Sequence, residues 1–198
     1  MTTVATARVG AAWRAAHAPA AGVPRWARTA ALAIPFLVLP SSLWRIVGIT
    51  LHVPIVNGAG ADGADGNLPS WLPVEVYVLL LSLLSEGLAF TAIGLVATWG
   101  EVFPRWVPFL RGRRVPTLGA VVPAALGAAV LTPLWGTLAV FVPRAQTVQG
   151  RPVEGPNPMD LNTWEGALAY GAYLPLVLWG PLLAAVTVAY WRRRRAAR

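Results

Sequence analysis

The chain has 198 residues, of which 56% are hydrophobic and only 12% are charged, and its mean hydropathy is +0.57. Soluble domains usually carry about a quarter charged residues, so this composition excludes a soluble enzyme, a nucleic-acid-binding protein and a disordered tail protein. The basic residues are 16 arginines and no lysine, which with eight acidic residues give a formal net charge of +8. No cysteine is present, which also excludes disulfides, thiolate nucleophiles and cysteine-ligated metals.

Four apolar stretches account for the shortage of charge: residues 29–52, 71–98, 117–142 and 164–191. Each is long enough to cross the ~30 Å hydrocarbon core of a bilayer, which takes about 20 helical residues. Apolar and polar residues do not alternate along them, so helices are predicted rather than membrane strands. Prolines inside the first, third and fourth spans predict kinks there: Pro35, Pro40, Pro123, Pro133, Pro175 and Pro181.

These spans predict an all-α fold, an integral membrane four-helix bundle that forms a single domain over residues 27–191. Residues 1–26 are rich in alanine with scattered arginines and lack the apolar core of a signal peptide. We expect them to be flexible or to lie at the membrane surface. Residues 192–198 are predicted to be a basic cytoplasmic tail that anchors the chain.

Arginine placement predicts the orientation, because arginines are retained on the cytoplasmic side. With both termini inside, the N-terminal segment places four arginines there, the loop between the second and third spans four, and the C-terminus five. Only Arg144 and Arg151 then lie outside, and Arg45 lies within a span. We therefore predict a protein of the cell membrane with N-in, C-in topology, whose partners include anionic lipid headgroups at the inner face.

Small residues predict which spans pack most closely. The third span carries Ala120, Ala124 and Ala128 at four-residue spacing, and the fourth carries Gly180 and Ala184 at the same spacing. Such faces let two helix backbones approach each other in lipid. We expect the third and fourth spans to pack tightly.

Charged side chains inside a span are costly and are the first candidates for function. Two polar stripes at helical spacing result: Ser41, Arg45, Gly48 and His52 on the first span, and Glu75, Ser82 and Glu86 on the second. Consecutive antiparallel helices would bring such stripes together. Measured from the outer ends, Arg45 and Glu75 lie about 10 and about 6 Å deep and Glu86 about 22 Å, so the Arg45–Glu75 ion pair is the easier one.

Several of these residues also have simpler explanations. Glu75 lies in a first helical turn, where the helix dipole favours a carboxylate, and Arg45 could extend to the outer headgroups. His52 suits a helix end at the interface. Glu165, three residues after Asn162, is typical of a capping box at the start of the fourth span.

Glu86 lies too deep to reach either interface, so it must be paired, solvated by water or protonated. A structural hydrogen bond to Ser82 or to a carbonyl freed by a proline is one outcome, and a general acid is another. The sequence has no phosphate-binding loop, nucleophile elbow or metal-ligand set, so neither a cofactor nor a metal is predicted.

Two segments, Pro40–Arg45 and Thr98–Trp106, make the first three spans resemble uncharacterised small four-span membrane proteins of high-GC Gram-positive bacteria. That resemblance implies membrane residence and no particular activity. The chain is also faintly similar to small bacterial membrane terpene cyclases, through Glu86 and the aromatic residues near it. No diagnostic motif of that family matches residue by residue.

Three classes of function follow. The favoured one is a non-enzymatic membrane protein, an accessory or structural component, in which the polar stripes hold the bundle together. The second is a membrane enzyme on an isoprenoid or lipid, with Glu86, Arg45 and Glu75 as candidate catalytic residues. Its candidate substrate-binding residues are Trp44, Ser82, Tyr170 and Tyr173. The third is a small transporter or proton pathway, which with four spans requires a homo-oligomer or a larger membrane partner.

Overall fold

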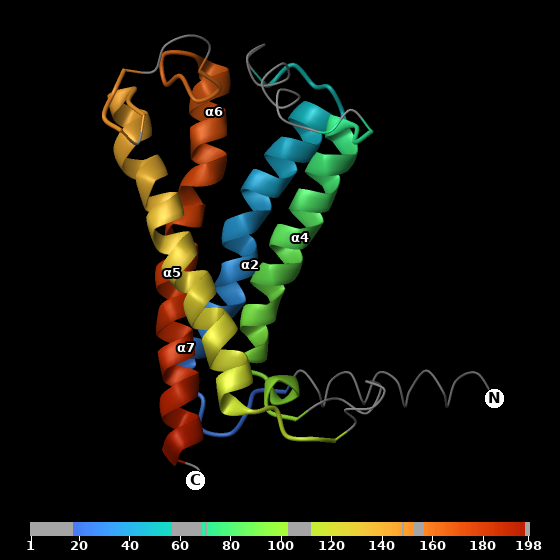
Figure 1. Ribbon diagram of the computed structural model, residues 1–198, viewed down its shortest axis with the longest axis vertical. Coiled ribbons are helices and arrows are strands. Elements are labelled where there is room, and N and C mark those ends of the chain that lie inside the picture. Colours follow the sequence, from blue (N-terminus) through green and yellow to red (C-terminus); the bar gives the residue numbers. More distant parts are fainter. Residues whose placement is uncertain are drawn as a thin grey trace, which may run out of the picture.

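The computed structural model describes residues 18–56, 69, 71–102, 112–147, 149–152 and 157–196. These residues form a helical bundle, without strands beyond isolated bridges, in which four helical runs are long and apolar enough to cross a membrane (Figure 1). The runs cover Arg25–Thr50, Val74–Gly94, Thr117–Arg144 and Trp164–Ala196. The predicted all-helical fold with four apolar spans is confirmed.

Each run is built from one or more helical elements. The first consists of α2 (Arg25–Arg45) and a π-helical turn, η1 (Ile46–Thr50), and the second of α4 (Val74–Gly94). The third consists of α5 (Thr117–Phe141) and η3 (Val142–Arg144). The fourth consists of α6 (Trp164–Tyr173), the 3-10 stretch η4 (Leu174–Leu178) and α7 (Trp179–Ala196). A short 3-10 turn, η2 (Thr98–Gly100), follows α4.

Prolines determine where three of the spans begin. Pro24, Pro73 and Pro116 stand immediately before α2, α4 and α5 with extended backbone angles. A proline disfavours the helical conformation in the residue before it, so the helix starts only after the proline. The second span therefore begins at Val74 rather than at residue 71, and the first begins directly after Pro24, at Arg25, upstream of the predicted residue 29.

The fourth span begins at Trp164 as predicted, but the predicted capping box of Asn162 and Glu165 is wrong. Thr163 is the N-cap, and its Oγ1 accepts a hydrogen bond from the backbone N–H of Gly166 at 3.1 Å. The side chain of Asn162 instead donates to Asp160 at 2.8 Å. Thr163 lies next to the helix, so its short side chain reaches the free N–H groups that Asn162 cannot reach.

Prolines inside the spans act differently from one another. Pro175 lies in η4, where the fourth span changes from an α-helix to a 3-10 helix, as expected where a proline lacks the N–H that an α-helix needs. Pro35 and Pro40 lie inside α2, and Pro123 and Pro133 inside α5, without ending these helices. Kinks at these prolines stay a prediction.

The buried core is formed mainly by α2, α4 and α7. Ala27, Ala31, Ile34 and Val38 of α2 recur at helical spacing and are fully buried against α4 and α7. The third span is the most peripheral, since only 6% of its most apolar window is buried, against 22–33% for the other three. It is attached mainly through α7, with which it makes the most extensive contact between any two helices of the described residues.

Close backbone approach between α5 and α7 confirms that the third and fourth spans pack tightly. A Cβ atom added to Gly180 would lie 2.6 Å from the backbone nitrogen of Thr132, so only glycine allows this contact. Ala128 is buried at the same interface, and Gly127 faces Leu183 of α7. Small residues therefore bring these two helices together, as expected where no water drives association.

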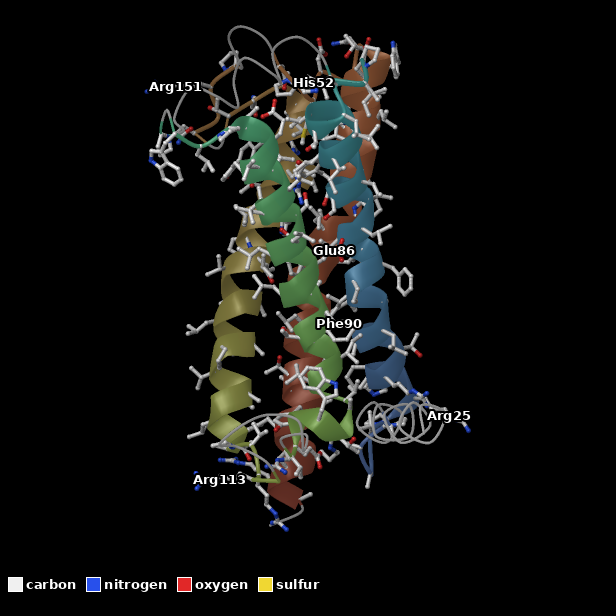
Figure 2. All side chains as sticks on the ribbon, turned by 90° about the vertical axis from the view of Figure 1, so that its right-hand side faces the viewer. Arg25, His52, Glu86, Phe90, Arg113 and Arg151 are labelled. Atoms are coloured by element: carbon white, nitrogen blue, oxygen red, sulfur yellow. The ribbon has the colours of Figure 1, made fainter. Side chains whose placement is uncertain are left out.

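The two ends of the bundle differ in charge. In the described chain one end, here called the basic end, carries Arg25, Arg28, Arg113, Arg114 and Arg192–Arg195, and the opposite end carries Arg144 and Arg151 (Figure 2). The first span starts and the last span ends at the basic end (Figure 1). The predictions for Arg8, Arg14, Arg105, Arg111 and Arg198, and for residues 1–17, lie outside the described residues.

Residues 18–24 contact the basic end of α4. The backbone N–H of Ala20 donates to Val96 O at 2.9 Å, and that of Thr98 donates to Ala18 O at 3.0 Å. Ala20 is buried. The segment that leads into α2 is thus hydrogen-bonded to the turn after α4.

At the other terminus, α7 continues as a helix to Ala196, so most of the predicted basic tail is helical.

Replacement of Gly180 by alanine is expected to lower the free energy of unfolding by about 1–3 kcal/mol, because the added methyl group must separate α5 from α7. The measurement is thermal unfolding of the purified chain in detergent. Gly136→Ala is the matched control, because nothing lies within 4 Å of a Cβ at that position of α5. Equal stability of the wild type and Gly180→Ala would contradict the packing described.

Candidate functional site

Arg45 is the buried charged residue around which the polar residues of the bundle gather. It lies in the last turn of α2 and is 7% exposed. Its Nε donates to Ser82 Oγ of α4 at 3.3 Å, its Nη1 to Tyr173 OH of α6 at 3.4 Å and its Nη2 to Ser42 Oγ at 3.4 Å. These four residues are called the Arg45 cluster, and they join three of the four spans.

Aromatic side chains enclose the same guanidinium and extend the cluster to the remaining span. The Arg45 guanidinium carbon lies 5.6 Å from the centre of the Tyr173 ring, close enough for a cation–π interaction. Trp44 meets the Tyr173 ring edge-on at 5.7 Å, and Trp135 of α5 lies 5.9 Å from it. Side chains of all four spans therefore meet around Arg45 and Tyr173, with the second span joined through Ser82 and Arg45.

The predicted ion pair between Arg45 and Glu75 is wrong. Among the described residues Glu75 instead pairs with His52, at 3.5 Å between Oε1 and Nε2. The two polar stripes do meet, but their register places His52 opposite Glu75 and Arg45 opposite Ser82. The His52–Glu75 pair is solvent-accessible, with side chains 72% and 36% exposed, so it adds little stability.

Glu86 lies one helical turn beyond Ser82, near the middle of the bundle's length (Figure 2). Its Oε1 atom is buried and has no hydrogen-bond partner among the described residues. The Glu86 carboxylate also forms no ion pair with the Arg45 guanidinium. The predicted hydrogen bond to Ser82 is therefore not formed by this oxygen. In the described part of the chain, Glu86 Oε1 is the one buried carboxylate oxygen without a hydrogen-bond partner.

The sequence missed two members of the site and included one residue that stays apart. Ser42 was not singled out, and Trp135 was overlooked because the third span carries no charge. Tyr170 is half-buried and makes no hydrogen bond or ring contact with the Arg45 cluster in the described residues. The indole N–H groups of Trp44 and Trp135 are buried without a described partner.

The main cavity of the described bundle lies elsewhere, between the basic-end halves of α4 and α5. Its volume is about 1050 Å³, and its lining includes Leu88, Phe90, Thr91, Trp99, Ala124, Gly127, Val130, Trp179 and Leu183. None of the lining residues is ionisable, and Arg45, Glu75 and Glu86 are not among them. The candidate acid and the cavity are thus separate features.

A second polar cluster closes the basic end. Arg193 forms an ion pair with Glu101 at 2.6 Å and also donates to Leu95 O at 3.3 Å. Arg194 donates to Val115 O at 2.8 Å, and Tyr190 OH donates to Gly100 O at 3.1 Å. Two of the four consecutive arginines therefore fix the chain between α4 and α5, beyond the predicted role as a headgroup anchor.

The described part of the chain contains no group of three or more histidine, cysteine, aspartate or glutamate side chains that could hold a metal ion. Comparison with protein-family models, curated proteins and solved structures found no match for the chain. The resemblances drawn from the sequence therefore stay predictions.

Proposed function

We propose that the chain is a non-enzymatic multi-pass protein of the cell membrane, a structural or accessory component whose interior serves to hold four spans together. The observation that carries this proposal is the Arg45 cluster. Each of the three guanidinium nitrogens donates to a side chain of the bundle itself, so the charge is held by the protein's own hydroxyl groups. In a membrane such bonds replace water as the partner of a costly charge.

The cavity supports the same proposal. A reaction centre needs an acid, base or nucleophile within hydrogen-bond reach of the substrate. The lining of the cavity holds no ionisable side chain, and Thr91, its one hydroxyl-bearing residue, donates its hydroxyl to its own helix, at Leu88 O. This composition suits binding of an apolar group and offers no proton donor for a reaction.

Both alternative functions depend on Glu86. An isoprenoid or lipid enzyme would use it as a general acid, and an oligomeric proton pathway would use it as a proton carrier. Its buried oxygen without a described partner is compatible with either role, but Glu86 is not among the residues that line the cavity, which favours neither. The exposed apolar surface of α5 leaves room for a homo-oligomer or a larger membrane partner.

We further propose that the basic end faces the cytoplasm, where it would meet anionic headgroups. The eight arginines at this end of the described chain, against two at the other, support this orientation. We thus propose that the chain resides in the cell membrane with both its N-terminus and its C-terminus in the cytoplasm.

Replacement of Glu86 by glutamine tests the enzymatic alternative. Total lipid extracts of cells expressing the wild type, Glu86→Gln or no copy are compared by mass spectrometry at matched protein levels. We expect no lipid species that depends on the wild-type chain, because a non-enzymatic protein makes no product. Glu75→Gln on the same helix is the control. A species lowered by about 10²–10⁴-fold in Glu86→Gln alone would show that Glu86 is a general acid and would refute the proposal.

Reporter fusions test the orientation. A reporter that is active only outside the cytoplasm is fused after Arg198 or inserted at Gly63. We expect it to be silent after Arg198 and active at Gly63, because the basic end is retained inside. Activity after Arg198 would overturn the N-in, C-in topology.

A further inference from the structure

The cavity between α4 and α5 is a lateral groove in the wall of the bundle. In the described chain α4 packs on α2 and α5 packs on α7, but α4 and α5 make almost no direct contact. Trp179 and Leu183 of α7 form the floor. Leu88, Leu126 and Val130 on the rims are more than half exposed, so the groove opens towards the lipid. This feature is called the α4–α5 groove.

Trp99 closes the groove at its basic end. The turn after α4 folds this ring under the helix, where a Cβ atom on Gly94 would lie 2.6 Å from it. The ring stacks on Phe90 with centroids 6.3 Å apart and an interplanar angle of 11°. Its Nε1 is buried and has no hydrogen-bond partner among the described residues. The stacked rings of Trp99 and Phe90 therefore form an apolar wall at this end of the groove.

Positive charge surrounds the same end. Val115 lines the groove, and the two residues before it, Arg113 and Arg114, are exposed. No carboxylate of the described chain lies within ion-pair distance of either, because Glu101 is paired with Arg193. Arg194 contributes a further guanidinium, which donates to Val115 O. The mouth of the groove carries uncompensated positive charge at the depth where a headgroup would lie.

We propose that the α4–α5 groove binds one anionic phospholipid, with an acyl chain along the apolar groove and the headgroup phosphate at Arg113 and Arg114. A phosphate supplies both the negative charge and the acceptor oxygens that this end lacks. The volume of about 1050 Å³ is at the upper limit of sites for small ligands, about 300–1,000 Å³. This inference rests on the proposed function and extends it, because it gives the non-enzymatic membrane protein a specific lipid ligand.

A helix from a second copy fits the groove less well. A two-fold symmetric dimer with both copies in the same orientation would bring the basic ends together, and like charges that meet in this way are unfavourable. An anionic lipid neutralises the same arginines. Zwitterionic lipids would fill the apolar groove but would leave the arginine charge uncompensated.

A photo-crosslinking experiment tests the site. The purified full chain is reconstituted in phosphatidylcholine vesicles that contain a trace of phosphatidylglycerol with a photoreactive acyl chain, and the labelled residues are mapped by mass spectrometry. We expect labelling concentrated on groove residues, displaced by added unlabelled phosphatidylglycerol and not by phosphatidylcholine. The anionic lipid is present in both leaflets, so the result does not depend on the proposed orientation.

Two variants and a control make the outcome decisive. Thr91→Trp fills the groove from an exposed rim position and should lower groove labelling at least about tenfold, as overfilled apolar pockets do. Leu83→Trp, which is also exposed on α4 but lies outside the lining, should leave it unchanged. The double variant Arg113→Gln, Arg114→Gln should retain labelling but lose the preference for the anionic lipid.

Labelling spread evenly over the lipid-facing sides of α4 and α5 would overturn the proposal, as would equal displacement by the two lipids. Cross-linked dimers joined through groove residues would assign the groove to a second copy instead. None of these outcomes bears on Glu86, so the failure of this site is distinguishable from the failure of the proposed non-enzymatic function.

Discussion

A guanidinium buried in a lipid-embedded bundle is the constraint on which the arrangement of the spans depends. No water is present in hydrocarbon to satisfy its donors, so their partners must come from other spans. Ser82 of α4 and Tyr173 of α6 each accept one of its hydrogen bonds, and Ser42 of α2 itself accepts a third. The rotation of each helix about its axis is thereby fixed, because a turn of α4 or α6 would remove its hydroxyl from reach. Trp135 brings α5 to the same point through the ring of Tyr173.

The fold was largely predictable from the sequence, because span length and apolar composition are properties of each segment alone. One helix start was later than predicted because a proline disfavours the helical conformation in the residue before it, as at Pro73. The site was predictable only in part. The polar stripes marked Arg45 and Ser82, and Tyr173 was named as a candidate substrate-binding residue. The partner of Arg45 depends on helix rotation and axial register, which the sequence of one span does not specify. Glu75 was therefore assigned to the wrong cation, and Trp135 was missed because no charge marks its span.

The structure separates two features that a membrane enzyme would combine. The Arg45 cluster lies in one half of the bundle, where its members hydrogen-bond to one another, whereas the groove lies in the other half and is lined mainly by apolar residues. Small residues explain this separation, because Gly180 and Ala128 bring α5 onto α7 and leave the space towards α4 open. At the basic end Arg193 and Arg194 of α7 bind Glu101 after α4 and Val115 before α5, next to the groove's mouth.

A double-mutant cycle between Arg45 and Tyr173 tests the central claim most directly. The free energy of unfolding in detergent is measured for the wild type, Arg45→Met, Tyr173→Phe and the double variant, with Tyr77→Phe in place of Tyr173→Phe as the control. We predict that both single variants of the cluster are destabilised and that their coupling energy is about 1 kcal/mol, as for hydrogen bonds between membrane helices, while Arg45 and Tyr77 show additive effects. Additive effects of Arg45 and Tyr173, or a gain of stability in Arg45→Met, would show that the Arg45 cluster does not hold the bundle together.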